Sequence, residues 1–257
     1  MKTRVSADLR GAGAPVVFLH GIGGGAESWA PQLDAFAPHY RTIAWNMPGY
    51  HGSPALDEMT FPALAETLLG LLDDLGLDRV HLVGHSIGGM VAQQFAATWP
   101  ERLRSLVLSA TSPAFGRSDG EFQHAFVAKR LEPLGNGQSM ADIAPGIVAE
   151  LIGEGADPAG AELARRCMAS VPAEAYRQAM RCLVTFDRRD ALPKIAVPTL
   201  LIAGENDTNA PAPMMERMAG KIPGTRFTVI PGAGHLANLE RPQTFNAVLA
   251  GFLGTQA

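Results

Sequence analysis

Three residues far apart in the sequence have the types and surroundings that acyl transfer needs. Ser86 lies between glycines in the motif "GHSIG" at 84–88, where an apolar run changes into a helical pattern. Asp207 follows one later apolar run, and His235 follows the next. A serine hydroxyl becomes a nucleophile only when a base removes its proton, and a carboxylate must orient that base. We therefore predict that Ser86 is the nucleophile, His235 the base and Asp207 the orienting acid, with Glu205 as the alternative acid.

The glycines around Ser86 have a geometric reason. A sharp turn from strand to helix forces the serine into strained backbone angles, and side chains at the flanking positions would collide with nearby backbone. Ser86 would then stand above the positive end of the following helix. The chain order serine, aspartate, histidine differs from the orders found in chymotrypsin and in subtilisin, and it is typical of a third architecture.

A second glycine-rich stretch, "FLHGIGGG" at 18–25, comes directly after an early apolar run. Such a loop can point a free backbone N–H into a site, where it stabilises the negative oxygen that forms during acyl transfer. We predict that the backbone N–H groups of Ile22 and Ile87 form this oxyanion hole. A phosphate-binding loop is the alternative, but the stretch has neither a G-x-G-x-x-G pattern with a downstream acid nor a Walker lysine.

A sheet must position these candidates, and the sequence contains suitable strands. Nearly continuous apolar runs predict parallel strands that are covered on both faces; they occupy 16–20, 41–45, 79–84, 103–109, 198–204 and 226–232. Segments with helical spacing alternate with them, at 60–75, 88–98, 213–219 and 242–252. We predict an α/β fold with a mostly parallel twisted sheet and helices on both faces.

One stretch breaks this alternation. Residues 111–189 contain helical segments punctuated by glycine and proline, and no convincing strand. We predict a core domain formed by 1–110 and 190–257, with a helical cap at 111–189 inserted between two strands. An insertion at that place would lie over the crevice where parallel sheets bind ligands.

Composition limits the class of partner. The 257 residues are 47% hydrophobic, and the formal net charge of -4 is spread without blocks. This excludes the basic footprint of a nucleic-acid or anionic-membrane surface. We expect a small-molecule substrate, no nucleic-acid or membrane partner, and no metal or organic cofactor. Nothing in the sequence specifies an oligomeric state.

Location and cysteine chemistry also have sequence signals. The N-terminal stretch lacks the apolar region of a signal peptide, and no apolar run approaches the roughly 20 residues that span a bilayer. We therefore expect a soluble cytoplasmic protein. Cys167 and Cys182 fit neither a metal-ligand spacing nor a disulfide framework, so we expect reduced thiols that fill the core.

The blocks "HGIGG", "MPGYHGS", "GHSIGG", "GENDTNAP" and "GHLANLERP" follow one another in an order and spacing that resemble the α/β-hydrolase superfamily over almost the whole chain. The end of the predicted cap and the tail "GHLANLERPQTFN" are most similar to the 3-oxoadipate enol-lactonases and related small capped esterases. The resemblance implies hydrolysis of a small ester or lactone, for instance in the breakdown of aromatic compounds.

Two residues depart from the family pattern. The loop that usually reads D-x-P-G-x-G-x-S has Asn46 in place of the acid and His51 in place of the second glycine.

Two alternative functions remain on this scaffold. Related capped hydrolases that cleave carbon–carbon bonds use the same three residue types, but they typically carry a tryptophan where this chain has Leu236. A non-catalytic binder on the same scaffold is the other alternative, and the complete set of three residues argues against it.

Basic residues near the end of the predicted cap suggest a substrate preference. If one or two of these arginines face inward, they could pair with a substrate carboxylate through bidentate hydrogen bonds; they are Arg177, Arg181, Arg188 and Arg189. The alternative is that all four are solvated on the outer face of the cap.

Overall fold

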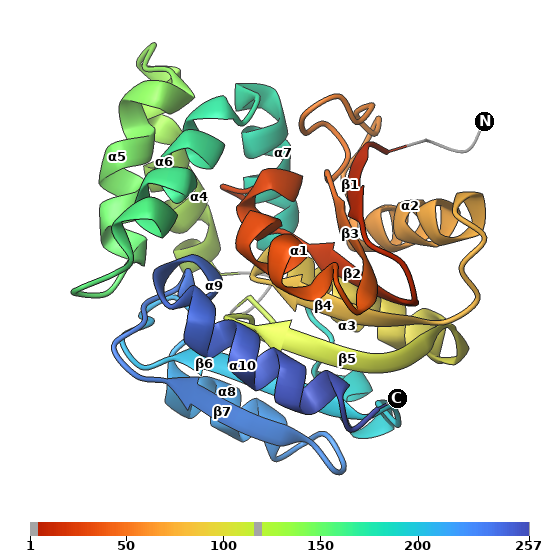
Figure 1. The fold of residues 1–257 in the computed structure, drawn as a ribbon. Coiled ribbons are helices and arrows are strands. Elements are labelled where there is room, and N and C mark those ends of the chain that lie inside the picture. The colour runs from red at the N-terminus through yellow and green to blue at the C-terminus, as the bar shows by residue number, and fades with distance from the viewer. Residues whose placement is uncertain (1–4, 116–119, 257) are drawn as a thin grey trace.

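A single twisted sheet forms the centre of the molecule (Figure 1). The computed structural model describes residues 5–115 and 120–256, and within them seven strands pair in the order β1-β3-β2-β4-β5-β6-β7. The strands are β1 (Ala7–Arg10), β2 (Ala14–Leu19), β3 (Tyr40–Trp45), β4 (Val80–His85), β5 (Leu103–Ser109), β6 (Thr199–Gly204) and β7 (Arg226–Ile230). Only β1 runs antiparallel to its neighbour, and the other pairings are parallel.

The apolar runs form strands because both faces of the sheet are covered. In β4, Val80 and Leu82 pack into one hydrophobic cluster and Val83 packs into the other, so successive side chains alternate between two cores. All six predicted strands are present. Strand β1 was not predicted, because it is a four-residue edge strand that is half-exposed and has no apolar run.

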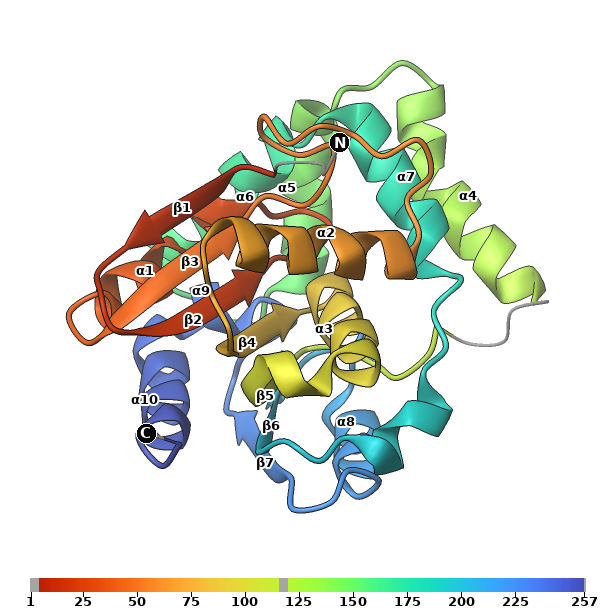
Figure 2. The same cartoon turned by 90° about the vertical axis from the view of Figure 1, so that its right-hand side faces the viewer.

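Helices cover each face in turn, as Figures 1 and 2 show. On one face, α1 (Ala30–Phe36) and α10 (Pro242–Leu253) contribute the side chains Leu33, Phe36, Phe245 and Leu249 to the smaller cluster. The opposite face is covered by α2 (Phe61–Asp74), α3 (Ile87–Thr98) and α8 (Ala212–Ala219). The predicted α/β fold class is therefore confirmed.

The segment predicted as a cap contains four helices among its described residues. They are α4 (Glu121–Gly135), α5 (Met140–Leu151), α6 (Pro158–Ser170) and α7 (Ala173–Leu183), and a short 3-10 helix, η3 (Arg189–Lys194), leads from them into β6. The two ends of the segment are joined, because Phe115 N–H donates to Phe186 C=O at 2.9 Å and Arg188 N–H donates to Pro113 C=O at 2.8 Å. The division into separate core and cap domains stays a prediction.

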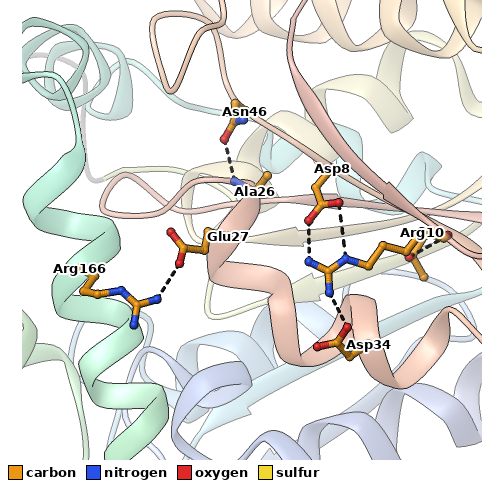
Figure 3. Close-up of polar contacts among 8 residues, drawn as sticks. Asp8, Arg10, Ala26, Glu27, Asp34, Asn46 and Arg166 are labelled. Atoms are coloured by element: carbon orange, nitrogen blue, oxygen red, sulfur yellow. Dashed lines mark hydrogen bonds and ion pairs between the residues drawn. The ribbon is translucent and has the colours of Figure 1, made fainter.

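An ion pair and a backbone hydrogen bond attach two of these helices to segments that follow strands of the sheet. Another 3-10 helix, η1 (Ala26–Trp29), follows the glycine-rich loop, and its Glu27 forms an ion pair of 2.6 Å with Arg166 of α6 (Figure 3). The carboxyl end of α5 meets the loop after β7, where His235 N–H donates to Leu151 C=O at 2.7 Å. Helices α5 and α6 are thus joined to segments that follow β7 and β2.

Two further expectations concern cysteines and membranes. Cys167 and Cys182 are free and buried, and burial raises the pKa of each thiol to about 12. Within residues 5–115 and 120–256, no helix combines the length and the apolar character needed to cross a membrane.

Candidate active site

The turn that carries Ser86 has the strained geometry expected for a nucleophile. Ser86 has φ of 54° and ψ of -121°, a backbone conformation that residues other than glycine rarely adopt. A Cβ on Gly84 would lie 2.4 Å from Gly88 C=O, and a Cβ on Gly88 would lie 2.4 Å from Leu19 C=O. The flanking glycines are therefore required by close packing of the turn against itself and against β2.

Asp207 and His235 are brought together from adjacent strands. Asp207 follows β6, His235 follows β7, and Nδ1 of His235 lies 2.8 Å from Oδ2 of Asp207. The other carboxylate oxygen, Oδ1, accepts the backbone N–H groups of Asn209 at 2.8 Å and Ala210 at 3.0 Å. This carboxylate is fully buried and fixed at both oxygens, so it holds one orientation of the imidazole.

The electrostatics of Asp207 favour its charged form. Burial raises the pKa of a carboxyl group, but at Asp207 the charge and hydrogen bond of His235 together with the two backbone N–H groups outweigh it, so the pKa lies below its usual value. Glu205, the alternative acid, does not contact the histidine ring. Its side chain accepts Gly232 N–H at 2.8 Å at the surface.

Ser86 and His235 line one cavity of about 540 Å³, which helices α4, α5, α6 and α7 also line. The walls are mainly apolar; they include Met90 of α3, Val148 of α5 and Met180 of α7. A cavity of this size and character accommodates a small organic molecule.

The predicted oxyanion donors lie on the two segments that meet at Ser86. Ile22 lines it, and Ile87 is the first residue of α3, directly after Ser86. In the described part of the chain, neither backbone N–H has an acceptor. A Cβ on Gly21 would lie 3.3 Å from Cβ of Ser86, so the glycine-rich loop packs directly against the nucleophile turn. Tyr50 steadies this loop, because its hydroxyl donates to Ile22 C=O at 3.0 Å.

The structure explains both departures from the family loop. Asn46 supplies an oxygen in place of the acid, and Oδ1 accepts the Ala26 N–H at 2.7 Å (Figure 3). Its Nδ2 donates to Ser6 Oγ at 2.9 Å, a bond that a carboxylate could not donate. His51 adopts φ of 38°, in the region that favours the glycine it replaces, and its ring lies against Gly25.

Two histidines beside the candidate residues are held neutral. Burial lowers the pKa of His20 to about 4 and that of His85 to about 3. At His85, the charge of the nearby His235 lowers the pKa further. The rings of His85 and His235 lie 5.0 Å apart. His20 bonds to backbone, so it braces the loops rather than facing the cavity.

Of the four arginines near the end of the inserted segment, one lines the cavity and the other three do not. Arg189 lines the cavity but is ion-paired with Asp187. Arg177 donates to Leu134 C=O, Arg188 donates to Gln94, and Arg181 is exposed. Arg130 of α4, which the sequence analysis missed, also lines the cavity.

Glu240 is a second residue whose role was missed. It belongs to the motif that contains His235, yet sequence alone assigned it no function. The structure buries its carboxylate at the end of the short helix α9 (Ala237–Glu240), against the loop that carries His235.

A parallel sheet with a strained serine turn, an aspartate–histidine pair and a shared cavity defines an α/β-fold hydrolase. The model of the alpha/beta hydrolase family matches residues 16–248, so the chain belongs to that family. A protein from Azorhizobium caulinodans that is named for carbamate hydrolysis is 28% identical, covering 96% of this chain and 94% of its own length. The 3-oxoadipate enol-lactonase 1 of Acinetobacter baylyi is 29% identical over 93% of this chain and 88% of its own length.

A solved structure extends the likeness to three dimensions. A thermophilic esterase from Thermogutta terrifontis, with malate bound, is 30% identical and superposes with a TM-score of 0.88. The match covers 98% of this chain and 93% of the esterase. The chain is therefore a hydrolase with esterases and a lactonase among its relatives.

Proposed function

We propose that this protein is a serine hydrolase that cleaves a small ester or enol-lactone by acyl transfer. The observation that carries the proposal is the 2.8 Å contact between Asp207 and His235 at a cavity that Ser86 also lines. A buried pair of this kind, beside a strained serine and two backbone N–H groups without acceptors, is the arrangement that activates a serine.

The reaction follows from the chemistry of these groups. Ser86 Oγ attacks the substrate carbonyl carbon while His235 Nε2 accepts the hydroxyl proton, and Asp207 stabilises the imidazolium. The carbonyl oxygen becomes an oxyanion between the N–H groups of Ile22 and Ile87. The C–O bond to the leaving group breaks as His235 returns the proton to it. Water then attacks the acyl-enzyme by the same route and frees the acid and Ser86.

The cavity supports a compact substrate. Its volume of about 540 Å³ lies in the range of pockets that hold small organic molecules. A lactone would open to a hydroxy acid, or its keto tautomer for an enol-lactone, without releasing a separate alcohol. The enol-lactonase and the esterase among the relatives support this class of substrate.

Two polar side chains in the cavity wall support a substrate that carries a carboxylate. Arg130 lines the cavity, with Nη1 3.2 Å from Oε2 of Glu150, a side chain that is 61% exposed. Tyr176 also lines the cavity, and its buried hydroxyl has no hydrogen-bond partner among the described residues. A carboxylate could pair with the guanidinium and accept from the hydroxyl. The malate bound to the related esterase is a dicarboxylate, which supports the same substrate class.

A fluorophosphonate probe tests the proposal without knowledge of the substrate. We expect mass addition at Ser86 in the wild-type protein and none in Ser86→Ala. A panel of p-nitrophenyl esters from acetate to palmitate, carbamates and lactones then defines the substrate, and activity should favour short esters and small lactones. Folded wild-type protein that stays unlabelled would favour a non-catalytic binder, and a preference for palmitate would contradict the proposed small substrate.

A further inference from the structure

The buried carboxylate of Glu240 holds the backbone on both sides of His235. Oε2 accepts Gly234 N–H at 2.8 Å, and Oε1 accepts Leu236 N–H at 2.9 Å. Glu240 is 1% exposed, and no lysine or arginine side chain of the described residues forms an ion pair with it. A buried charge is costly unless hydrogen bonds satisfy it, so these N–H groups are its compensation.

The same carboxylate also reaches the cap. Its Oε2 accepts a third backbone N–H, that of Gly153 at 2.6 Å, from the connection between α5 and α6. Asp157 N–H at the far end of this connection donates to Glu240 C=O at 3.0 Å. One carboxylate therefore joins the loop of the histidine to the segment that covers it.

The contact between the histidine loop and the connection after α5 leaves no space for a side chain at its glycines. A Cβ on Gly234 would lie 2.4 Å from Leu151 C=O, and a Cβ on Gly153 would lie 2.4 Å from Gly232 C=O. The backbones of the two segments are in direct contact, and His235 N–H is bonded across the joint to Leu151 C=O. The position of the histidine therefore depends on this joint.

The charged groups around His235 come from three places. Asp207 contacts the ring, and His85 packs against it as a neutral imidazole. Arg241 directs its guanidinium to the carbonyl oxygens of Glu154, Gly155 and Gly232. Glu240 is thus a second buried negative charge close to the histidine, and a negative charge favours the imidazolium that forms when Ser86 loses its proton.

We propose that Glu240 is a positioning residue for His235, which it holds against the cap while its charge favours the protonated imidazole. This inference rests on the proposed serine hydrolase. It predicts two separable effects of Glu240, one on the placement of the histidine loop and one on the pH at which the histidine becomes protonated.

The test measures the rate at which a fluorophosphonate probe labels Ser86, as a function of pH, in the wild type and in Glu240→Gln. The amide has one acceptor oxygen, so at least one of the three N–H groups loses its partner. We expect labelling to be slower by about 10-fold or more, and the midpoint of the acid limb to move to lower pH because the negative charge is lost. A purely structural role would lower the rate without moving the midpoint.

Glu205→Gln is the matched control, because Glu205 also accepts a backbone N–H of this loop, that of Gly232, but at the surface. It should keep the wild-type rate and midpoint. If Glu240→Gln does not fold, Glu240→Asp retains the charge on a shorter side chain and should be labelled more slowly with an unchanged midpoint.

The outcomes separate the two proposals. Wild-type protein that is not labelled at Ser86 overturns the proposed function and this inference with it. Wild-type protein that is labelled, together with a folded Glu240→Gln variant of wild-type rate and midpoint, overturns the role of Glu240 alone. If Glu240→Gln does not fold, a Glu240→Asp variant that is labelled at the wild-type rate also overturns the role of Glu240.

Discussion

The imidazole of His20 accepts the backbone N–H of Met47 at 3.0 Å through Nε2, while Nδ1 lies 2.7 Å from Gly21 C=O and donates to it. This contact ties the glycine-rich loop after β2 to the loop after β3. It requires a neutral ring with its proton on Nδ1, because a protonated Nε2 would face the Met47 N–H as a second donor. Placement of the candidate oxyanion loop therefore depends on the protonation state of a histidine outside the cavity.

Stability should fall in mild acid. Burial lowers the pKa of His20 and His81 to about 4 and that of His85 to about 3. Between these values and the unfolded value near 6.5, the unfolded chain binds protons that the folded chain does not. The free energy of unfolding should therefore decrease as pH falls below about 6.5, by up to about 1.4 kcal/mol per pH unit for each histidine.

Urea denaturation at a series of pH values from 7 to 4 measures this slope. His81→Gln provides the internal comparison, because His81 lies in β4 with Nδ1 2.8 Å from Ser105 Oγ, outside the candidate site. The variant should have a shallower slope by about one proton. A wild-type slope near zero over this range would contradict the neutral state of all three histidines.

Asn46→Ala should destabilise the protein and lower its activity, whereas Asn46→Asp should do so much less. The alanine leaves the buried N–H of Ala26 without its acceptor, which costs about 1 to 3 kcal/mol of unfolding free energy. The aspartate keeps an oxygen at that place and loses only the donation to Ser6. Thermal melts and kcat/KM on a short ester compare the two variants, and equal effects would show that the Ala26 contact is unimportant.

Asp207→Asn should leave the fold intact and lower kcat by about 10³ to 10⁴. The amide oxygen can still accept the N–H groups of Asn209 and Ala210, but its NH₂ group would then donate to Nδ1 of His235. This selects the tautomer with a proton on Nε2, which cannot accept the proton of Ser86. Steady-state kinetics with a circular dichroism melt makes the comparison, and activity near wild type would mean that another group orients the base.

Arg130→Met should reduce kcat/KM for a carboxylated lactone by about 10- to 100-fold, the range for losing one charge-assisted hydrogen bond. An uncharged short ester should be affected little, because only the carboxylate needs the guanidinium. Arg165→Met is the matched control, since Arg165 pairs with Glu162 on the same helix and is not part of the cavity wall. Equal losses on charged and uncharged substrates would argue against a carboxylate contact.

The strands and the strained serine turn could be predicted because their signals are local. An apolar run predicts a buried strand, and "GHSIG" predicts a tight turn that requires glycines on both sides of the serine. Strand β1 and helix α1 are short and lack such a signal. Sequence could place Asp207 and His235 at one edge of the sheet, since both follow parallel strands, but the 2.8 Å contact between them is a product of tertiary packing.

Other parts of the site depend on which way a side chain points, which periodicity does not determine. Of the arginines near the end of the insertion, Arg189 lines the cavity, whereas Arg177 and Arg188 bond elsewhere; Arg130 of α4 lines it too, without any sequence signal. Glu240 looked like an ordinary acid in a familiar motif. Its three backbone partners come from two segments more than eighty positions apart, so no local pattern could reveal them.

The joint between the cap and the histidine loop sets a rule for exchanging parts among related hydrolases. Helices α4 and α7 line the cavity, yet they are not joined to the histidine loop in the way that the connection after α5 is. A chimaera that imports α4 and α7 from a relative should gain a new substrate range and keep its chemistry. A chimaera that replaces residues 151–157 would also need a matching histidine loop. Substrate choice can therefore be engineered independently of reactivity through α4 and α7, but not through the connection after α5.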